Sequence, residues 1–422
     1  MERNTLRTVL VGSVLCGFLF VSAGVCRAGN WPGWRGPTGM GTTDEKDLPL
    51  TWDAKTGDGI LWKASLKGTT GHSCPIVWGD KVFLTTAARQ SREQESAKEV
   101  PEHYLTCYQA SDGKELWKTA IPQGKMPAGY AIYAVPTPVT DGKAVYMWFG
   151  SGVAAAVDFD GKVLWRHERE GPLNLNPGIC SSLTLFGDTV LLLIDQGRGK
   201  GVLQALDKKT GEVKWEQKRT KSGCNNTTPI LIQVGGKPQL VILGEGTLEG
   251  LNPATGEQVW WCKARGFGES PVCAGGMVYA DKGGNETAAC VDPTGTGDVT
   301  ETKVKWHITK SAGDYGSPVI VGEYIYKPCK DGVVGCRKVA DGSEVFKADL
   351  KGVSKLASPF ATADGRVYFV NGGTSYVLKA GPKAEVLATN DLRNGGNGSS
   401  PAVADGRIYI RGSEWLFCIG KK

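Results

Sequence analysis

Residues 205–215 read A-L-D-K-K-T-G-E-V-K-W, and residues 250–260 repeat the pattern as G-L-N-P-A-T-G-E-Q-V-W. Each stretch has a small, an apolar and a polar residue, then a Thr-Gly turn, then a tryptophan four residues after the glycine. A glycine turn between two short apolar segments is typical of a β-hairpin. The pattern therefore predicts the last two strands of a repeating antiparallel unit.

Weaker copies of this hairpin run through the chain. Its turn becomes Asp-Gly at Gly113, Gly161 and Gly342, and Phe346 replaces the last tryptophan. The tryptophans at 117, 165, 215, 260 and 306 are 48, 50, 45 and 46 residues apart. A period of 40–50 residues is typical of propeller blades and similar repeat architectures.

The first half of each repeat has its own signature. A Ser/Thr-Pro dipeptide is followed by a turn and then, about eight residues after the proline, by an aromatic or apolar residue. Its starting residues are Ser73 (with Cys74 before the proline), Thr137, Ser182, Thr228, Ser270, Ser317, Ser358 and Ser400, where the Ser182 copy lacks the proline. A turn between alternating apolar residues predicts a second hairpin. The chain thus contains eight copies of a four-stranded unit.

A four-stranded sheet of 40–50 residues cannot bury both of its faces alone, but such sheets bury them against their neighbours when they stack radially. We therefore predict an all-β, eight-bladed β-propeller of four-stranded antiparallel blades. The last copy ends after a third strand at 414–419, whereas residues 59–63 form an unmatched strand with a tryptophan, Trp62. We expect this N-terminal strand to close the last blade, which removes an exposed edge.

Composition agrees with many short strands. The 422 residues include 59 glycines, and the net charge is +6 with no block of lysines or arginines. Frequent glycine disfavours long helices, and the absence of a basic block argues against a nucleic-acid partner.

The N-terminus has the three parts of a secretory signal. Arg3 and Arg7 precede an apolar run over 8–25, and cleavage is expected after Ala28. Cys26 follows Val25, which is too large for a typical lipoprotein site, and no later stretch has enough apolar residues to span a membrane. We predict a periplasmic or secreted protein divided into a signal peptide (1–28), an N-terminal extension (29–51) and the propeller (52–422).

The A-x-D-x-x-T-G-x-x-x-W pattern resembles the tryptophan-docking motif of quinoprotein-like, or PQQ-like, eight-bladed propellers. That family includes pyrroloquinoline quinone (PQQ) dehydrogenases and BamB, the propeller of the outer-membrane assembly machinery. Residues 31–37, W-P-G-W-R-G-P, resemble the mature N-terminus of a secreted bacterial branch. The resemblance covers residues 31–419 and implies the fold; it leaves the chemistry open. It also implies a docking role for Trp62, Trp117, Trp165, Trp215, Trp260 and Trp306.

The dehydrogenases of this family have an adjacent pair of cysteines beside the quinone, and calcium ligands. No two cysteines are adjacent here, and neither the calcium ligands nor a Ser-His-Asp set can be placed. We therefore expect no catalytic residues, no metal and no cofactor, and leave PQQ with calcium as an alternative.

Polar residues precede several first strands, where a propeller has its central channel. They are His72, Asn225, Asn226, Glu269, Tyr315 and Asn397. Such groups at a channel mouth suit a polar ligand, a sugar or a peptide; the simpler interpretation is turn capping and solvated channel lining.

Cysteines and one insertion leave further alternatives. Cys107, Cys336 and Cys418 occupy a small buried position shared with Ala155, Ala205 and Gly250, and we expect small apolar packing there rather than disulfides. A Cys329–Cys336 bridge would need a shifted register. The polar insertion at 89–103 predicts a mobile flap, with partner contact as the alternative.

The leading hypothesis is an exported, non-catalytic scaffold or binding module, a monomeric ring with a protein or polymer partner. The alternatives are a PQQ- and calcium-dependent dehydrogenase and a glycan-binding propeller.

Overall fold

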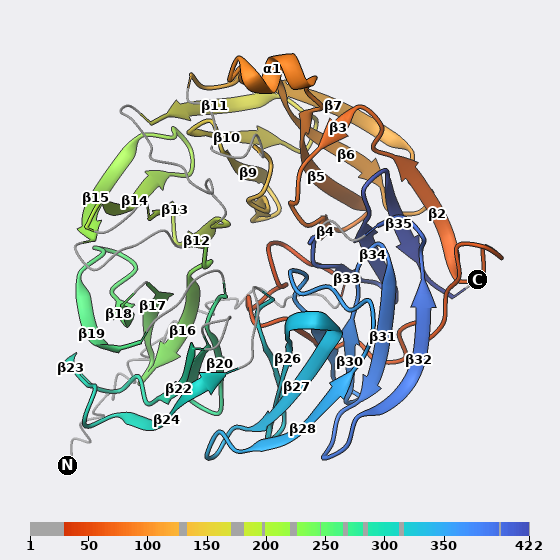
Figure 1. The fold of residues 1–422 in the computed structure, drawn as a ribbon. Helices are drawn as coiled ribbons and strands as arrows, with labels where there is room; N and C mark the ends of the chain where they lie inside the picture. Colours follow the sequence, from red (N-terminus) through yellow and green to blue (C-terminus); the bar gives the residue numbers. More distant parts are fainter. Residues whose placement is uncertain are drawn as a thin grey trace, which may run out of the picture.

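The computed structural model describes residues 29–125, 133–169, 181–195, 199–219, 226–244, 246–264, 269–281, 286–311, 316–395 and 398–421. Eight β-sheets stand around a common axis like the blades of a propeller (Figure 1). Each has an inner strand toward the channel and an outer strand at the rim, which confirms the predicted eight-bladed architecture.

The first four blades follow the chain order, with neighbouring strands antiparallel. Blade 1 consists of β3 (Thr69–Thr70), β4 (Ile76–Trp78), β5 (Lys81–Ala88), β6 (His103–Gln109) and β7 (Glu115–Ile121). Blade 2 consists of β8 (Val139–Thr140), β9 (Ala144–Phe149), β10 (Val153–Asp158) and β11 (Val163–Glu168). Blade 3 consists of β12 (Thr184–Phe186), β13 (Thr189–Ile194), β14 (Gly201–Asp207) and β15 (Val213–Arg219). Blade 4 consists of β16 (Ile230–Val234), β17 (Lys237–Leu243), β18 (Thr247–Leu251) and β19 (Gln258–Lys263).

The next three blades repeat this order. Blade 5 consists of β20 (Val272–Ala274), β21 (Met277–Asp281), β22 (Glu286–Val291) and β24 (Val304–Ser311). Blade 6 consists of β25 (Val319–Val321), β26 (Tyr324–Pro328), β27 (Val333–Lys338) and β28 (Glu344–Asp349), with the 3₁₀ turn η1 (Lys330–Gly332). Blade 7 consists of β29 (Phe360–Thr362), β30 (Arg366–Phe369), β31 (Thr374–Lys379) and β32 (Glu385–Asp391). Two short strands add in parallel, β1 (Thr42–Thr43) to β29 and β23 (Gly297–Asp298) to β19.

Blade 8 joins the two ends of the described chain. Its first three strands are β33 (Ala402–Ala404), β34 (Arg407–Arg411) and β35 (Trp415–Ile419), and β2 (Ile60–Ser65) supplies the fourth. Trp62 lies opposite Cys418 in this antiparallel pair. The predicted closure by the N-terminal strand is confirmed.

Blades are linked at the channel by a hydrogen-bonded collar. In each blade the backbone N–H of the residue at the start of the inner strand donates to the side chain of the equivalent residue in the next blade. The collar residues are Cys74, Thr137, Ser182, Thr228, Ser270, Ser317, Ser358 and Ser400. Seven of the eight acceptors are hydroxyls and the eighth is the thiol of Cys74, so the circle is complete.

Near the rim, tryptophans link several blades to the next one. Trp62 Nε1 donates to the Ala110 carbonyl at 2.9 Å, and the Trp62 ring lies against the turn at Gly113, where a Cβ atom would overlap it. The indole N–H groups of Trp117, Trp165 and Trp306 reach the carbonyls of Phe159, Lys208 and Val339 in the same way.

Two docking tryptophans depart from this pattern. Trp215 lies against Gly256, but its Nε1 has no hydrogen-bond partner among the described residues. Trp260 donates to Gln239 of its own blade, 2.7 Å away. Its ring covers Gly250, where a Cβ atom would collide with Nε1, so this position requires glycine.

The small position opposite the tryptophan is occupied by Cys107, Cys336 and Cys418 in the register of the sheets, where Cys336 faces Phe346. In blade 2 the partner of Trp165 is Ala156, one residue later than the spacing predicts, because the turn there is one residue shorter. The eight cysteines in the described ranges are free thiols, Cys329 and Cys336 included.

The predicted flap contains a short helix, α1 (Arg92–Ser96), whose N-terminus is closed by a capping box between Ser91 and Gln94. Within the described ranges, no helix is long and apolar enough to cross a membrane. The proposed signal peptide lies outside the described residues.

Candidate functional site

Three of the six predicted channel-mouth residues, Asn225, Tyr315 and Asn397, lie outside the described residues. His72 and Asn226 stand two positions before the collar and Glu269 stands one position before it, all at the same end of the channel. They belong to blades 1, 4 and 5, and no hydrogen bond or ion pair between described atoms joins them. Each is therefore considered with its own neighbours.

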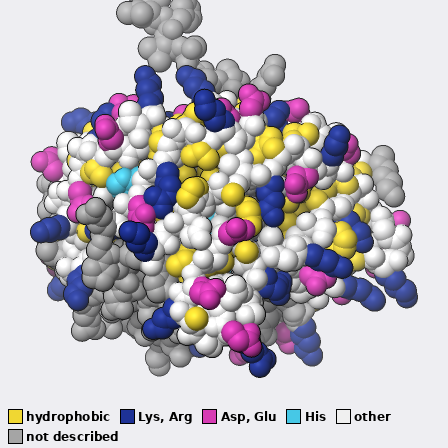
Figure 2. Space-filling view, turned by 90° about the horizontal axis from the view of Figure 1, so that it is seen from above, with side chains coloured by type: hydrophobic (Ala, Val, Ile, Leu, Met, Phe, Trp, Pro, Cys, Tyr) yellow, Lys and Arg dark blue, Asp and Glu magenta, His cyan; other side chains and the backbone are white. Residues whose placement is uncertain are grey.

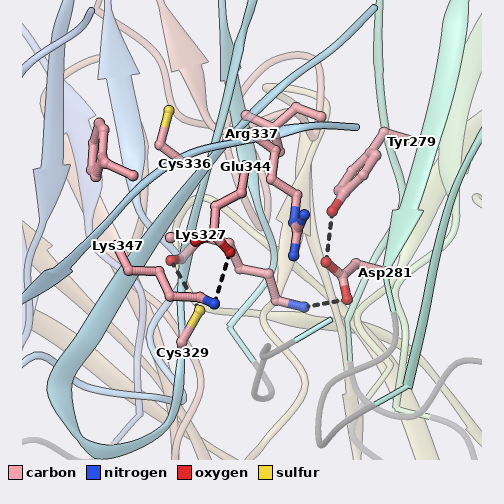
Figure 3. A pocket seen from close by; sticks show the side chains of 11 residues that line it. Tyr279, Asp281, Lys327, Cys329, Cys336, Arg337, Glu344 and Lys347 are labelled. Atoms are coloured by element: carbon pink, nitrogen blue, oxygen red, sulfur yellow. Dashed lines mark hydrogen bonds and ion pairs between the residues drawn. The ribbon is translucent and has the colours of Figure 1, made fainter. Parts of the chain in front are cut away.

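Glu269 is the one that forms a charged cluster, which we call the mouth cluster. Lys327 Nζ lies 3.1 Å from Glu269 Oε1 and 2.9 Å from Asp281 Oδ1. The Tyr279 hydroxyl donates to Asp281 Oδ2 at 2.6 Å (Figure 3). Blade 5 supplies both acids and the tyrosine, and blade 6 supplies the lysine, so the cluster bridges two blades.

Strand geometry explains this meeting. Tyr279 and Asp281 are two residues apart on β21 and therefore point to the same face of blade 5. All four side chains are buried. Buried charges are tolerated when they are paired and hydrogen-bonded, and Lys327 supplies that pairing for both acids.

Two carboxylates share one ammonium. Burial raises the pKa of Glu269 to about 7, and the charge of Asp281 acts in the same direction, against the lowering effect of Lys327. Glu269 Oε2 accepts no hydrogen bond from any described group. For Lys327, burial lowers the pKa, but the charges of Asp281 and Glu269 outweigh it and raise the pKa to about 12.

The cavity at this cluster is small, about 20 Å³, which suits one water molecule. Its lining includes the thiols of Cys329 and Cys336 as well as Lys327. An ion pair between Glu344 and Lys347, 2.7 Å apart, borders it (Figure 3).

The resemblance to quinoprotein dehydrogenases implies calcium and PQQ at a channel mouth. Calcium takes six to eight oxygen ligands. At the mouth cluster the Lys327 ammonium already binds both acids, and the cavity has no space for a tricyclic quinone. The Glu269–Asp281 pair therefore does not fit a calcium–PQQ site.

His72 lies at the junction of blades 8 and 1, close to Arg411. The Arg411 guanidinium donates to Ser73 Oγ at 2.8 Å and to the carbonyl of Thr85 at 3.1 Å, and it is fully buried. Burial and the charge of Arg411 lower the pKa of His72 to about 4, so the imidazole is neutral at pH 7. This arrangement ties the last blade to the first.

A buried His–Ser pair was not predicted. His103 Nε2 lies 2.7 Å from Ser151 Oγ, and the imidazole stacks on Phe149 with ring centroids 4.5 Å apart. Neither side chain is accessible to solvent, so this contact packs blade 1 against blade 2.

Sequence reasoning also missed Asp281 and Lys327, although a signal was present. Asp281 stands two residues after the repeat aromatic, where blades 3, 4 and 7 have Leu193, Leu243 and Val370. Blade 8 has a second charged residue, Arg411, at this position, which is apolar in most other blades. A charged residue at a mostly apolar repeat position indicates a special pairing.

The rim shows a second candidate surface. Each outer strand contains a β-bulge next to the residue in the docking position, which leaves one extra residue unpaired in every blade. That residue is apolar in six blades, as Leu61, Leu116, Leu164, Val259, Val345 and Leu387, and lysine in the other two, as Lys214 and Lys305. Leu116, Leu164 and Leu387 are 40, 47 and 38% exposed. We call these three the rim leucines.

The surface around the rim mixes charges of both signs with apolar side chains (Figure 2). In the described chain, β7 and β11 pair with their own blade on one edge and with no strand on the other. The outer edge of blade 4 differs, since β23 adds to β19 there.

Comparison with known proteins agrees with the propeller. BamB from Moraxella catarrhalis has a TM-score of 0.61 at 16% identity, with 86% of this chain and 97% of that chain covered. A europium-containing methanol dehydrogenase has a TM-score of 0.55 at 14% identity, with 90% and 89% covered. The computationally designed Ika8 protein has a TM-score of 0.55 at 12% identity, with 86% and 99% covered. At such identities these likenesses show the fold alone.

No curated protein sequence matches the chain. Residues 41–168 and 199–345 match the family described as outer membrane protein assembly factor BamB, and these ranges cover more than half of the chain. The chain belongs to this BamB family of PQQ-repeat propellers.

Proposed function

We propose that this protein is an exported, non-catalytic propeller that binds an extended segment of another exported protein at its rim. The observation that carries the proposal is the set of rim leucines on bulges of outer strands. A bulge adds a residue that its own sheet does not pair, and here this residue is a large apolar side chain left in solvent. Single exposed leucines are common on protein surfaces. The rim leucines support binding because an exposed leucine recurs at the same bulge position in three blades.

Blades 1 and 2 are the best supported docking region. Leu116 and Leu164 occupy the same bulge position in these neighbouring blades. Arg166 of β11 donates to the carbonyls of Pro122 and Gln123 at 2.9 and 3.1 Å. These two residues directly follow β7, so the bonds join the outer strand of blade 2 to the end of the outer strand of blade 1. The region is therefore continuous across the blade boundary.

The mode of binding is strand addition. An extended peptide can pair with an exposed strand edge and place alternate side chains in neighbouring apolar contacts. Blade 4 supplies an intramolecular example, because Trp260 and Trp261 of β19 pair in parallel with Gly297 and Asp298. The family match to an outer-membrane assembly factor supports an exported protein as the partner.

Site-specific photo-crosslinking in the exported compartment tests this. A photoreactive amino acid replaces Leu116 or Leu164, and matched controls carry it in place of Lys214 or Lys305, the bulge residues of blades 3 and 5. We expect one common protein adduct at both leucine positions and not at the lysine positions. Absence of an adduct at 116 and 164, or equal adducts at all four, would contradict the proposal.

A further inference from the structure

Residues 29–45, which we call the strap, run along the inner strands near the channel, and Figure 1 draws them in red near the middle of the ring. Trp31 pairs with Val77 of blade 1 in an antiparallel bridge. The Thr140 N–H of blade 2 donates to the Pro32 carbonyl at 2.8 Å. Inner strands are sheet edges, so the strap uses their free backbone groups as an added strand would.

The strap pairs with blade 7 in the same way. β1 lies parallel to β29, with Thr42 opposite Ala361 and Thr43 opposite Thr362. Arg35 extends from the strap toward the neighbouring blades and donates to the carbonyls of Pro318 and Pro359 at 2.5 and 3.4 Å. The inner edges of blades 1, 2 and 7 thus accept short backbone pairings, at Trp31, Pro32 and 42–43, from a segment rich in glycine and proline.

Blades 3 and 4 offer the same edge with no strand upon it. Over the described ranges, β12 pairs with β13 alone and β16 with β17 alone. A cavity of about 190 Å³ lies between these strands and the strap. One water needs about 10–15 Å³ by such a measure, so this space is far larger than a hydration site.

The lining has a consistent chemistry. Strap residues 32–34 and 36–39 form one wall, and residues 183–185 and 228–231 form the facing wall. None of the lining residues carries a charge; they are apolar side chains, threonines, prolines and glycines, with the half-buried ring of Trp34 among them. A charged ligand would lose its hydration there without a partner, whereas the backbone groups of an uncharged peptide can pair with the open edges of β12 and β16.

From this we infer that the channel contains a binding site for a short, extended, uncharged peptide segment, which adds to the inner edges of blades 3 and 4 beside Trp34. Backbone groups of β12 and β16 pair with the peptide, and the Trp34 ring packs against an apolar or proline side chain. The site is separate from the rim surface, so it does not depend on the proposed function. It is continuous with the strap, the intramolecular example of the same contact.

Amide hydrogen exchange with a defined probe tests the inference. The probe is the acetylated and amidated peptide Trp-Pro-Gly-Trp, which copies residues 31–34, at millimolar concentration. We expect at least fivefold slower exchange in β12 and β16 and no change in β7 and β11. No binding, protection at the rim strands instead, or faster exchange across residues 29–45 from displacement of the strap would each overturn it.

Two variants localise the site. Thr38 lines the cavity from an exposed position, so Thr38→Trp narrows the space without disturbing the core. We expect it to weaken probe binding at least tenfold, as should Trp34→Ala. Thr56→Trp, at an exposed turn outside the channel, and Trp415→Ala, on β35, are the matched controls and should bind as the unchanged protein does. Equal binding by all four variants would reject the site.

Discussion

The backbone N–H of Ser400 donates a hydrogen bond to Sγ of Cys74, 3.1 Å away. These residues are 326 positions apart in sequence, and their contact closes the collar between the last blade and the first. Cys74 in turn donates its own N–H to Thr137 Oγ1 at 2.9 Å. The thiol is therefore a structural acceptor, and burial raises its pKa.

Replacement of Cys74 tests the collar. Cys74→Ser supplies the hydroxyl found at the other seven positions and should equal or exceed the original protein in free energy of unfolding. Cys74→Ala leaves the buried Ser400 N–H without an acceptor, and we expect a loss of about 1–3 kcal/mol. Denaturant unfolding measures both. Ser400→Ala is the matched comparison, because it removes the equivalent acceptor of the Ser358 N–H and should cause a similar loss. If Cys74→Ala were as stable as Cys74→Ser, the thiol would not be a structural acceptor.

Indole hydrogen bonds should distinguish two docking tryptophans. Trp62 donates from Nε1 to Ala110, whereas Nε1 of Trp215 has no described partner. Trp62→Phe should therefore lower the free energy of unfolding by about 1 kcal/mol more than Trp215→Phe does. Trp62→Ala should lose about 3–5 kcal/mol, because it also opens a cavity at the blade that closes the ring. Thermal and urea unfolding supply the values, and equal losses in the two Phe variants would argue against the bond.

Turn glycines under docking tryptophans should tolerate no side chain. Gly113 has φ +75° and a Cβ atom there would overlap the Trp62 ring, while Gly406 has φ +71° and open space around it. Gly406→Ala should lose about 1 kcal/mol from backbone strain alone. Gly113→Ala bears the same strain and a steric clash, so its loss should be clearly larger. Parallel urea titrations compare them, and similar losses would show that the ring moves freely aside.

Stability should depend on pH through Glu269. Its pKa rises from 4.5 in its ordinary state to about 7 in the folded protein, chiefly through burial. The folded state therefore holds a proton that the unfolded state releases between these values. Its contribution to stability is fully present below pH 4.5 and is lost as pH rises through 7.

Glu269→Gln removes this titration and tests the assignment. Urea unfolding between pH 4.5 and 8 should show a shallower decline in stability for the variant than for the unchanged protein, with the largest difference in slope between pH 5 and 7. Identical slopes in the two proteins would show that Glu269 is ionised across this range.

Much of the fold was predictable because it rests on local signals. The glycine turns before Trp117, Trp165 and Trp215, the Ser/Thr-Pro dipeptides and the unmatched strand around Trp62 predicted eight blades and their closure. The antiparallel pairing of β2 with β35 agrees. Each blade is specified by its own turn residues and by the alternation of apolar and polar side chains along its strands. Both signals lie within one repeat of about 45 residues.

The candidate site was predictable only in part. Glu269 could be placed at the channel mouth from its position before Ser270, but its partner Lys327 comes from the next blade, 58 residues away. The partners of a buried charge depend on how two sheets face each other, and one sequence does not contain that geometry. The same holds for His103 with Ser151.

The amino-acid sequence by itself determined the repeat, the number of blades and the strand that completes the ring, since hydrophobic alternation and turns act over short distances. Tertiary structure decided that Cys74 completes a hydrogen-bonded collar, that the strap lies along the channel edges and that leucines stand on rim bulges. Those features depend on closure of the ring, which brings together groups that are far apart in the chain. Burial of these groups then determines how much each contact contributes to the free energy of unfolding.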